Sequence, residues 1–254
     1  MQYRKHSRGL LICGDAHEKS VTETVDAEFG EGESCVPQFP LIICDPPYGD
    51  ILPNVAWDKA DYPKWMKHCA EVASNDATIC MWGGVGKRHS RAFLLFASLV
   101  EEHFPAWEIK NWITWGKRRA YGVKDNYLFT REECLILTRG KPTFNIPLLE
   151  VKRGYAGYNP KYPAKSEFLR RTNVWSDVTE MFSGKVHPAQ KPDRLYEILI
   201  ATHSNAGDVI YDPCAGSCTT ARVALALGRR YCVIEKEMSY LLDSGMWELK
   251  KERA

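Results

Sequence analysis

Several features that define common protein classes are missing from this sequence of 254 residues. No apolar run approaches the roughly 18 residues that a membrane-spanning helix needs. The first nine residues, MQYRKHSRG, are basic but contain no apolar segment of the kind that signal peptides carry. The nine cysteines are an odd number without a C-x-x-C pair, which is typical of free thiols in a reducing compartment. Together these absences predict a cytoplasmic protein.

Metal-binding and phosphate-binding motifs are absent as well. Cys214 and Cys218 share one loop, but two cysteines without nearby partners do not make a zinc or iron–sulfur site, so we predict no metal. The chain has neither a phosphate loop ending in Gly-Lys-Ser/Thr nor a G-x-G-x-x-G pattern. Its hydrophobic content of 44% and its length suit one globular α/β domain with a modest insertion.

The net charge of +2 conceals a strong asymmetry along the chain. Residues 110–171 contain 14 Lys and Arg against 5 Asp and Glu, a net charge of +9, so the remaining residues carry −7. A basic central segment in an otherwise acidic chain favours a polyanionic partner, most plausibly nucleic acid. On charge alone, a solvated charged surface remains the alternative.

The stretch LIICDPPYG at 41–49 is the most informative part of the sequence. Its four apolar residues are typical of a strand buried on both faces. Pro46 and Pro47 end that strand because neither can donate to a ladder. The sequence therefore predicts a carboxylate, a rigid carbonyl and an aromatic ring at the carboxyl edge of a sheet, where open α/β sheets bind their ligands.

A second stretch, VIYDPCAGSCTTARVALALG at 209–228, has the form strand, acid, small-residue turn and helix. Small residues allow a ligand to approach the backbone, and a helix N-terminus offers unpaired N–H groups. Glu235 follows at the end of the next predicted strand, a position that suits a carboxylate bound to ribose hydroxyls. These residues predict a nucleoside-binding βαβ unit.

Hydrophobic periodicity predicts alternating strands and helices along most of the chain. Strands are expected at 10–13, 41–44, 77–82, 107–115, 134–138, 209–211 and 231–234. Helices are expected at 62–74, 87–102, 193–204, 221–227 and 237–250. Residues 18–38 are expected to be mostly loop, with a short helix as the alternative, residues 117–127 a loop or lid, and residues 140–186 an insertion. The pair 107–115 and 133–138 is expected at an antiparallel edge.

Three motifs in a particular order resemble those of a known family. DPPY at 45–48, HPAQKP at 187–192 and DPCAGSCTT at 212–220 together resemble the DNA amino-methyltransferases that use S-adenosylmethionine. The order, with DPPY ahead of the methyl-donor loop, looks like the beta class of these enzymes. The resemblance implies a doubly wound, mostly parallel, seven-stranded α/β sheet in a single domain, 1–254, with 140–186 as a target-recognition insertion.

The resemblance also implies how the DPPY residues act. Asp45 and the backbone carbonyl of Pro46 would accept hydrogen bonds from the exocyclic amine of a flipped-out base, so that its lone pair points at the donor methyl group. Tyr48 would stack on that base, and Pro47 is a rigid spacer. The mechanism is direct methyl transfer without a covalent intermediate.

Further residues are assigned to the cofactor by the same resemblance. Residues Asp212 to Ser217 would wrap the methionine part of the cofactor, and Lys191 would help to fix its methionine end. Glu235 would bind the ribose, and Asp15 would lie near the adenine. For His187, packing between prolines in a turn is an equal alternative to a binding role. The cofactor-binding set is Asp15, His187, Lys191, Asp212, Pro213, Cys214, Ala215, Gly216, Ser217 and Glu235.

The basic segment supplies the expected DNA contacts. Its members would grip phosphates near the flipped base or read and stack on bases, although a plain surface role is the alternative for each of them. The DNA-binding set is Lys117, Arg118, Arg119, Lys124, Arg153, Tyr155, Tyr158, Arg170 and Arg171.

One residue departs from the pattern of the family. Its donor loop usually reads G-S-G-T-T, and here Cys218 replaces the second glycine. If that position requires a positive φ, the substitution costs free energy and weakens or alters donor binding.

The predicted activity is methylation of adenine N6 in double-stranded DNA. Adenine is preferred because the family's cytosine-N4 enzymes commonly carry serine where Asp45 stands. The alternatives are a cytosine-N4 methyltransferase, an RNA methyltransferase, and a weakly active or non-catalytic nucleic-acid-binding relative. A homodimer and a cognate restriction endonuclease are further expected partners.

Overall fold

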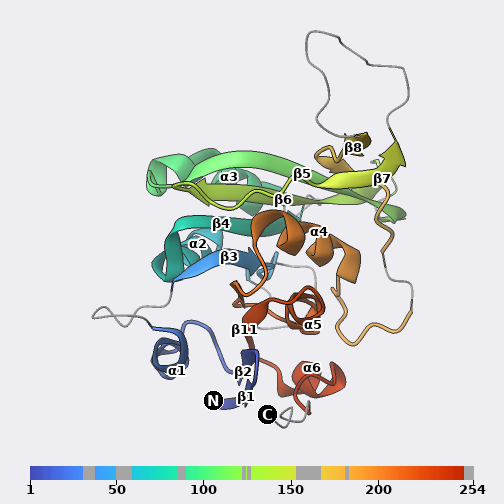
Figure 1. Ribbon diagram of the computed structural model, residues 1–254. Helices are drawn as coiled ribbons and strands as arrows, with labels where there is room; N and C mark the ends of the chain where they lie inside the picture. The colour runs from blue at the N-terminus through green and yellow to red at the C-terminus, as the bar shows by residue number, and fades with distance from the viewer. Residues whose placement is uncertain are drawn as a thin grey trace.

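The computed structural model describes residues 1–30, 38–49, 59–84, 90–121, 124, 127–152, 167–180 and 183–248 (Figure 1). Within them, strands and helices alternate along most of the chain. The strands are β1 Gln2–His6, β2 Gly9–Cys13, β3 Phe39–Cys44, β4 Ala73–Gly84, β5 Glu108–Tyr121, β6 Phe129–Arg139, β7 Leu148–Lys152, β8 Phe168–Arg170, β9 Val174–Trp175, β10 Val209–Asp212 and β11 Arg230–Glu235. The helices are α1 Lys19–Phe29, α2 Tyr62–Val72, α3 Ser90–His103, α4 Asp193–His203, α5 Thr219–Ala226 and α6 Met238–Asp243.

One mixed sheet forms the centre of the described structure. Its strand order is β1-β2-β11-β10-β3-β4-β6-β5-β9, and the run from β2 to β4 is parallel throughout. Strand β6 is antiparallel to both β4 and β5, as the sequence predicts for this edge. The seven expected strands are therefore the inner seven, and β1 and β9 extend the two edges.

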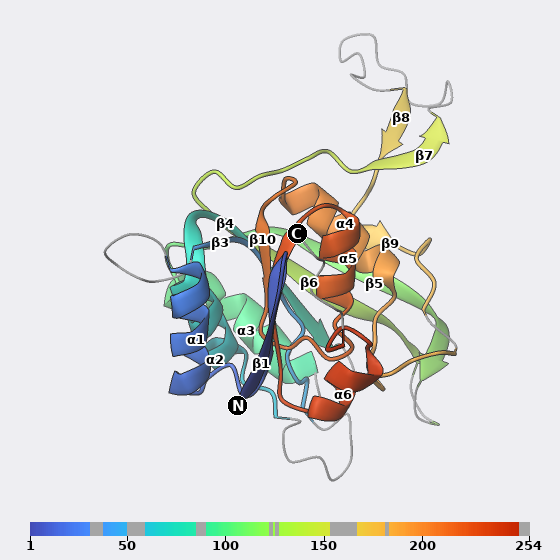
Figure 2. The same cartoon turned by 60° about the horizontal axis from the view of Figure 1, so that its bottom comes forward.

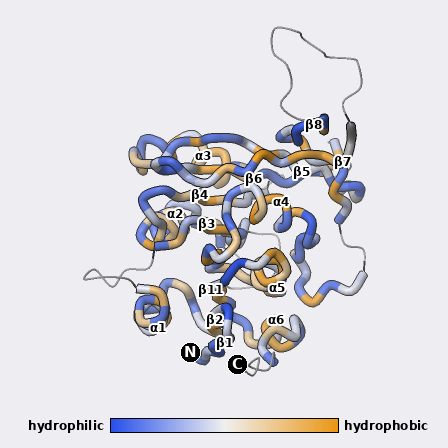
Figure 3. Tube along the Cα trace, in the orientation of Figure 1, coloured by the Kyte–Doolittle hydropathy of each residue, from blue (hydrophilic) through white to orange (hydrophobic). Residues whose placement is uncertain are grey.

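Helices cover both faces of the sheet, which confirms the doubly wound α/β prediction. Figure 2 shows α1, α2 and α3 on one side of the strands and α4, α5 and α6 on the other. Strands covered on both faces have continuous apolar sequences, and Leu41, Ile42 and Ile43 of β3 are completely buried. Figure 3 shows hydrophobic residues along these central strands and hydrophilic ones on the outer surfaces.

Local sequence signals explain where α2 begins. The Asp61 carboxylate accepts a hydrogen bond from the Lys64 backbone N–H at 3.1 Å, and Pro63 occupies the first turn. The helix then buries Tyr62, Met66 and Cys69 on one face. This spacing is the helical periodicity that the sequence shows.

Several segments differ from expectation. The short helix left open within residues 18–38 is present as the 11-residue helix α1, so this segment is less of a loop than expected, and Val21 and Val25 are its buried residues. Strand β5 continues to Tyr121, so the expected loop at 117–127 begins later. The expected insertion contains β7, β8 and β9, of which β7 and β8 pair in a separate hairpin that stands away from the main sheet (Figures 1 and 2). No helix in the described part of the chain is long and apolar enough to cross a membrane.

Gly83 in β4 allows α3 to pack closely on the sheet. A Cβ atom at this position would lie 2.1 Å from Cδ2 of the buried Phe93 ring. We therefore expect Gly83→Ala to destabilise the fold by about 1–3 kcal/mol through overpacking. Gly116→Ala in β5 is the matched control, because its Cβ would meet no atom closer than 3.8 Å. Chemical unfolding measures both variants, and equal effects would contradict this account of the packing.

Candidate active site

The pairing of β3 with β10 brings the two informative motifs together. These parallel neighbours pair at Leu41 with Ile210 and at Ile42 with Tyr211. The loops that follow them, 45–49 and 213–218, therefore leave the same edge of the sheet. Strands β11 and β2 lie next in order, so Glu235 and Gly14-Asp15 reach this edge as well. The structure thus brings four acidic residues from distant parts of the sequence to one edge.

Asp45 is held by partners on both carboxylate oxygens. The Tyr48 hydroxyl donates to Asp45 Oδ1 at 2.8 Å, and the Lys191 ammonium contacts Oδ2. Tyr48 is buried, and this burial, with Asp45 and Glu132 nearby, raises the pKa of its phenol well above the usual value. Tyr48 thus remains a hydrogen-bond donor, and its expected stacking on a base requires a ring face to become accessible.

Lys191 extends this contact into a charge network. Its ammonium also donates to the Tyr48 hydroxyl at 2.9 Å and lies 3.2 Å from Oε2 of Glu132. The other carboxylate oxygen of Glu132 contacts Lys117. The ammonium lies 4.8 Å from the centre of the Trp82 ring. Burial opposes ionisation of Glu132, but Lys191 and Lys117 outweigh it and lower the pKa of this carboxyl to about 2.

The sequence did not assign a role to Glu132. Glu132 and Glu133 are adjacent in the sequence, which alone cannot show which of the two carboxylates faces the site. Adjacent strand residues point to opposite faces. Accordingly Glu133 accepts hydrogen bonds from the Trp112 ring N–H at 2.6 Å and the Thr114 hydroxyl at 2.7 Å instead of contacting Lys191.

The donor turn, 213–218, is fixed by two acidic side chains. Asp212 accepts hydrogen bonds from the Cys214 backbone N–H at 2.9 Å and from the Thr220 hydroxyl. Glu235 accepts from the Gly216 N–H at 2.7 Å and from the Glu237 N–H at 2.8 Å. Burial raises the pKa of Asp212 to about 7 and also raises the pKa of Glu235. Within this turn, Pro213, Ala215 and Ser217 are buried and Cys214 is partly buried.

Two further predicted cofactor residues lie at the same edge of the sheet. The His187 ring covers Gly216 of the donor turn, where an added Cβ would lie 3.5 Å from it, and packs against Tyr240 with ring centres 4.3 Å apart. Asp15 accepts from the His17 N–H at 3.0 Å and pairs with Lys236, the residue after Glu235, at 3.2 Å. Burial opposes ionisation of Asp15, but these two partners outweigh it and lower its pKa. The cofactor roles of His187 and Asp15 stay predictions.

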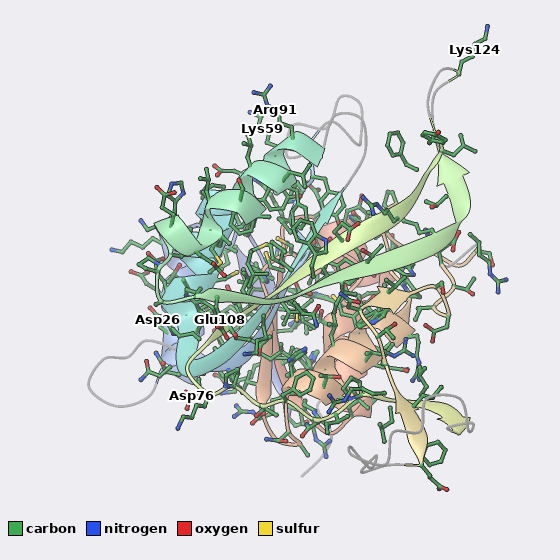
Figure 4. All side chains as sticks on the ribbon, turned by 90° about the horizontal axis from the view of Figure 1, so that it is seen from above. Asp26, Lys59, Asp76, Arg91, Glu108 and Lys124 are labelled. Atoms are coloured by element: carbon green, nitrogen blue, oxygen red, sulfur yellow. The ribbon has the colours of Figure 1, made fainter. Side chains whose placement is uncertain are left out.

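The predicted DNA contacts fall into different environments. Lys117 belongs to the charge network, and Arg171 forms a bidentate ion pair with Asp177 at 2.8 Å for each contact. Arg118 and Arg170 are exposed, and Figure 4 shows Lys124 pointing away from the body of the protein. The Arg119 side chain and the residues Arg153, Tyr155 and Tyr158 lie outside the described part of the chain.

Comparison with known proteins identifies the family of these motifs. A family model described as DNA methylase, N6_N4_Mtase, matches residues 39–244. The DNA adenine methyltransferase YhdJ of Escherichia coli K12 is 28% identical over 225 residues, covering 79% of this chain and 73% of YhdJ.

Two solved structures share the fold. The M1.HpyAVI–SAM complex has a TM-score of 0.59 at 21% identity and covers 93% of this chain and 98% of its own. The cytosine-N4-specific PvuII DNA methyltransferase has a TM-score of 0.68 at 16% identity and covers 98% and 89%. At these identities the likeness shows the fold, and it confirms the predicted methyltransferase-like sheet.

Cys218 occupies a backbone conformation that favours glycine. Its φ of 56° and ψ of 30° are left-handed, and it is the one non-glycine residue with positive φ in the described ranges. We expect Cys218→Gly to be more stable than Cys218→Ala by about 1 kcal/mol, because both lose the thiol and only glycine loses the strain. In the helix α5, by contrast, Ala224→Gly should lower the stability of the protein, because glycine is unfavourable in a helix. Unfolding in urea compares these variants, and a more stable Cys218→Ala would contradict the strain.

The raised pKa of Asp212 predicts how stability depends on pH. A carboxyl whose folded pKa is about 7 favours folding fully below its unfolded value near 3.8, and this contribution is lost as pH rises through about 7. The decrease in the free energy of unfolding that is attributable to Asp212 should not exceed about 4 kcal/mol. Asp212→Asn should remove it, so the stability of this variant should fall less than that of wild type between pH 5 and pH 8. Parallel pH dependences of the two proteins would refute this prediction.

Proposed function

Because this chain belongs to the DNA methylase family, we propose that it transfers a methyl group from S-adenosylmethionine to the exocyclic N6 amine of adenine in double-stranded DNA. One observation carries this proposal. The parallel pairing of β3 with β10 places the Asp45 acceptor beside the small-residue turn that follows Asp212. A methyl acceptor and a methyl donor can therefore meet at one edge of the sheet.

The residues around the donor turn suit S-adenosylmethionine. Gly216, which has a φ of +51°, is partly exposed in the turn, and its lack of a side chain makes room for the His187 ring. Glu235 and Asp15 stand at the ends of neighbouring strands, where carboxylates can bind a ribose and an adenine amine. When bound, this cofactor supplies an electrophilic methyl group on a positively charged sulfur.

Asp45 orients the acceptor amine in this mechanism. Its carboxylate and the Pro46 carbonyl accept the two N–H groups of the amine, which turns the nitrogen lone pair away from the ring and toward the methyl group. The contacts of Asp45 with Tyr48 and Lys191 hold the carboxylate in one orientation before the base arrives. The catalysis is therefore electrostatic positioning.

Two observations favour adenine over cytosine. The first residue of the DPPY motif is an aspartate, Asp45, whereas the cytosine-N4 enzymes of the family commonly carry serine there. YhdJ, a relative over most of this chain, is named as a DNA adenine methyltransferase. The likeness to the cytosine-N4-specific PvuII enzyme concerns the fold.

The insertion at 140–186 is the proposed target-recognition element of the single domain. Its β7–β8 hairpin stands away from the sheet, with Arg170 exposed on β8 (Figure 1). Lys124 follows the carboxyl end of β5, projects outward (Figure 4) and offers a phosphate contact. The target base must leave the duplex to reach Asp45, because its amine is otherwise engaged in pairing. A homodimer and a cognate restriction endonuclease stay predictions.

The activity is tested with purified protein, labelled S-adenosylmethionine and genomic DNA that lacks modified bases. We expect label in the DNA and N6-methyldeoxyadenosine after digestion to nucleosides, as measured by mass spectrometry. Asp45→Ala should reduce transfer at least 100-fold, because removing one preorganised hydrogen-bonding group costs about this much. Asp76→Ala, which changes an exposed carboxylate far from this edge, should transfer normally.

The outcomes separate the competing functions. N4-methyldeoxycytidine in place of methyladenine would replace the proposed base and keep the enzyme class. Binding of cofactor and DNA without any transfer would refute the enzymatic proposal and leave a nucleic-acid-binding protein.

A further inference from the structure

Four charged side chains, of which Lys191 is buried and the other three are partly buried, form a chain that ends at the proposed amine acceptor. Lys117 from β5 contacts Glu132 from β6, Glu132 contacts Lys191 from the HPAQKP segment, and Lys191 contacts Asp45. We propose that Lys191 and Glu132 are positioning residues of the reaction: Lys191 holds Asp45 in the orientation of an acceptor, and Glu132 keeps Lys191 in place. This inference rests on the proposed methyl transfer.

The hydrogen bonding of Lys191 leaves its ammonium little freedom. An ammonium has three N–H donors. Asp45, Tyr48 and Glu132 supply one acceptor each, and the Lys191 side chain is only 3% exposed. A buried cation with every donor paired keeps one orientation, because leaving would break all three contacts without water to replace them. Lys191 therefore fixes Asp45 Oδ2 while the Tyr48 hydroxyl fixes Oδ1.

The charge of Lys191 serves the acceptor role of Asp45. An ionised carboxylate accepts hydrogen bonds with both oxygens, whereas a protonated one presents an O–H donor. The Lys191 ammonium contacts Oδ2 of Asp45 directly, and such a charge-assisted contact is made to a carboxylate, the form that accepts the amine N–H groups.

Glu132 makes the burial of Lys191 tolerable. Burial by itself lowers the pKa of Lys191, but Asp45 and Glu132 outweigh it and raise this pKa above the ordinary value. Lys117 in turn occupies the second oxygen of Glu132. The four groups together are neutral, with two positive and two negative charges, which limits the cost of burying them.

Other titratable groups also face Asp45 and must be considered in any pH profile. They come from its own loop, from α2, from β6, from the segment before α4, from α4 itself and from the end of β10. These groups are Tyr48, Tyr62, Cys134, His187, Tyr196 and Asp212. The phenols and the thiol have raised pKa values, and burial lowers the pKa of His187, so these groups are neutral near pH 7. Among the described residues, Lys191 is the one that forms a direct ion pair with Asp45.

The test is kcat and KM for DNA, together with the pH dependence of kcat/KM, in wild type and in variants of the network. We expect Lys191→Met to lower kcat by about tenfold or more with little change in KM for DNA, because Asp45 loses the contact that orients it as an acceptor. We expect Glu132→Gln to move the basic limb downward by at least about one unit, because Lys191 stays buried with one carboxylate fewer. Glu132→Asp keeps the charge and should restore most of the wild-type profile.

Glu133→Gln is the matched control for Glu132→Gln. It removes the neighbouring carboxylate on the same strand, which is also buried but bonds to Trp112 and Thr114. It should leave both limbs in place, even if the protein becomes less stable. Thermal unfolding identifies any variant that fails to fold, and the folded Glu132 variants then decide the question without Lys191→Met.

Cofactor binding distinguishes this role from the one that the sequence predicts for Lys191. Calorimetry with S-adenosylmethionine should give Lys191→Met an affinity within about threefold of wild type. A loss of cofactor affinity of tenfold or more with an unchanged kcat would overturn the inference and make Lys191 a cofactor ligand. Superimposable profiles for all variants of an active enzyme would also overturn it, whereas an inactive wild type would refute the proposed function itself.

Discussion

The parallel pairing of β3 with β10 is the constraint on which the rest of the site depends. Hydrogen bonds between these strands set the register of Leu41 with Ile210, and both strands then end at the same edge. The acceptor loop and the donor turn are 167 residues apart, counted from Asp45 to Asp212, yet the sheet makes them neighbours. The order of the motifs along the chain is therefore immaterial to the chemistry, because spatial adjacency comes from strand order.

Gathering acidic side chains at one edge has an electrostatic cost, and the structure meets it in two ways. Glu132 lies between two lysines, and its pKa falls to about 2. Asp212 is more deeply buried and accepts hydrogen bonds from neutral donors, and its pKa rises to about 7. The two lysines therefore keep Glu132 ionised, whereas Asp212 can exchange its proton near neutral pH.

The sequence predicted the seven inner strands, most of the helices and the loops at 45–49 and 213–218. Each of these depends on local patterns, such as an apolar run that ends in Asp-Pro. The sequence could not assign Glu132, since the choice between Glu132 and Glu133 depends on which face of β6 meets the site. Arg171 counts as a basic residue in the sequence, but its pairing with Asp177 appears only in three dimensions. The polar edge strand β1 was missed because its residues are mostly exposed and lack an apolar signal.

The segment HPAQKP connects the two halves of the site. His187 covers Gly216 in the donor turn, and four residues later Lys191 contacts Asp45. Helix α4 begins immediately afterwards, and its first residue, Asp193, pairs with Arg222 of α5, the helix that follows the donor turn. A shift of this segment would therefore disturb the acceptor and the donor turn together. Because its two ends contact different loops, this segment of six residues links the proposed acceptor, Asp45, to the proposed donor turn, and direct transfer requires a fixed distance between the two.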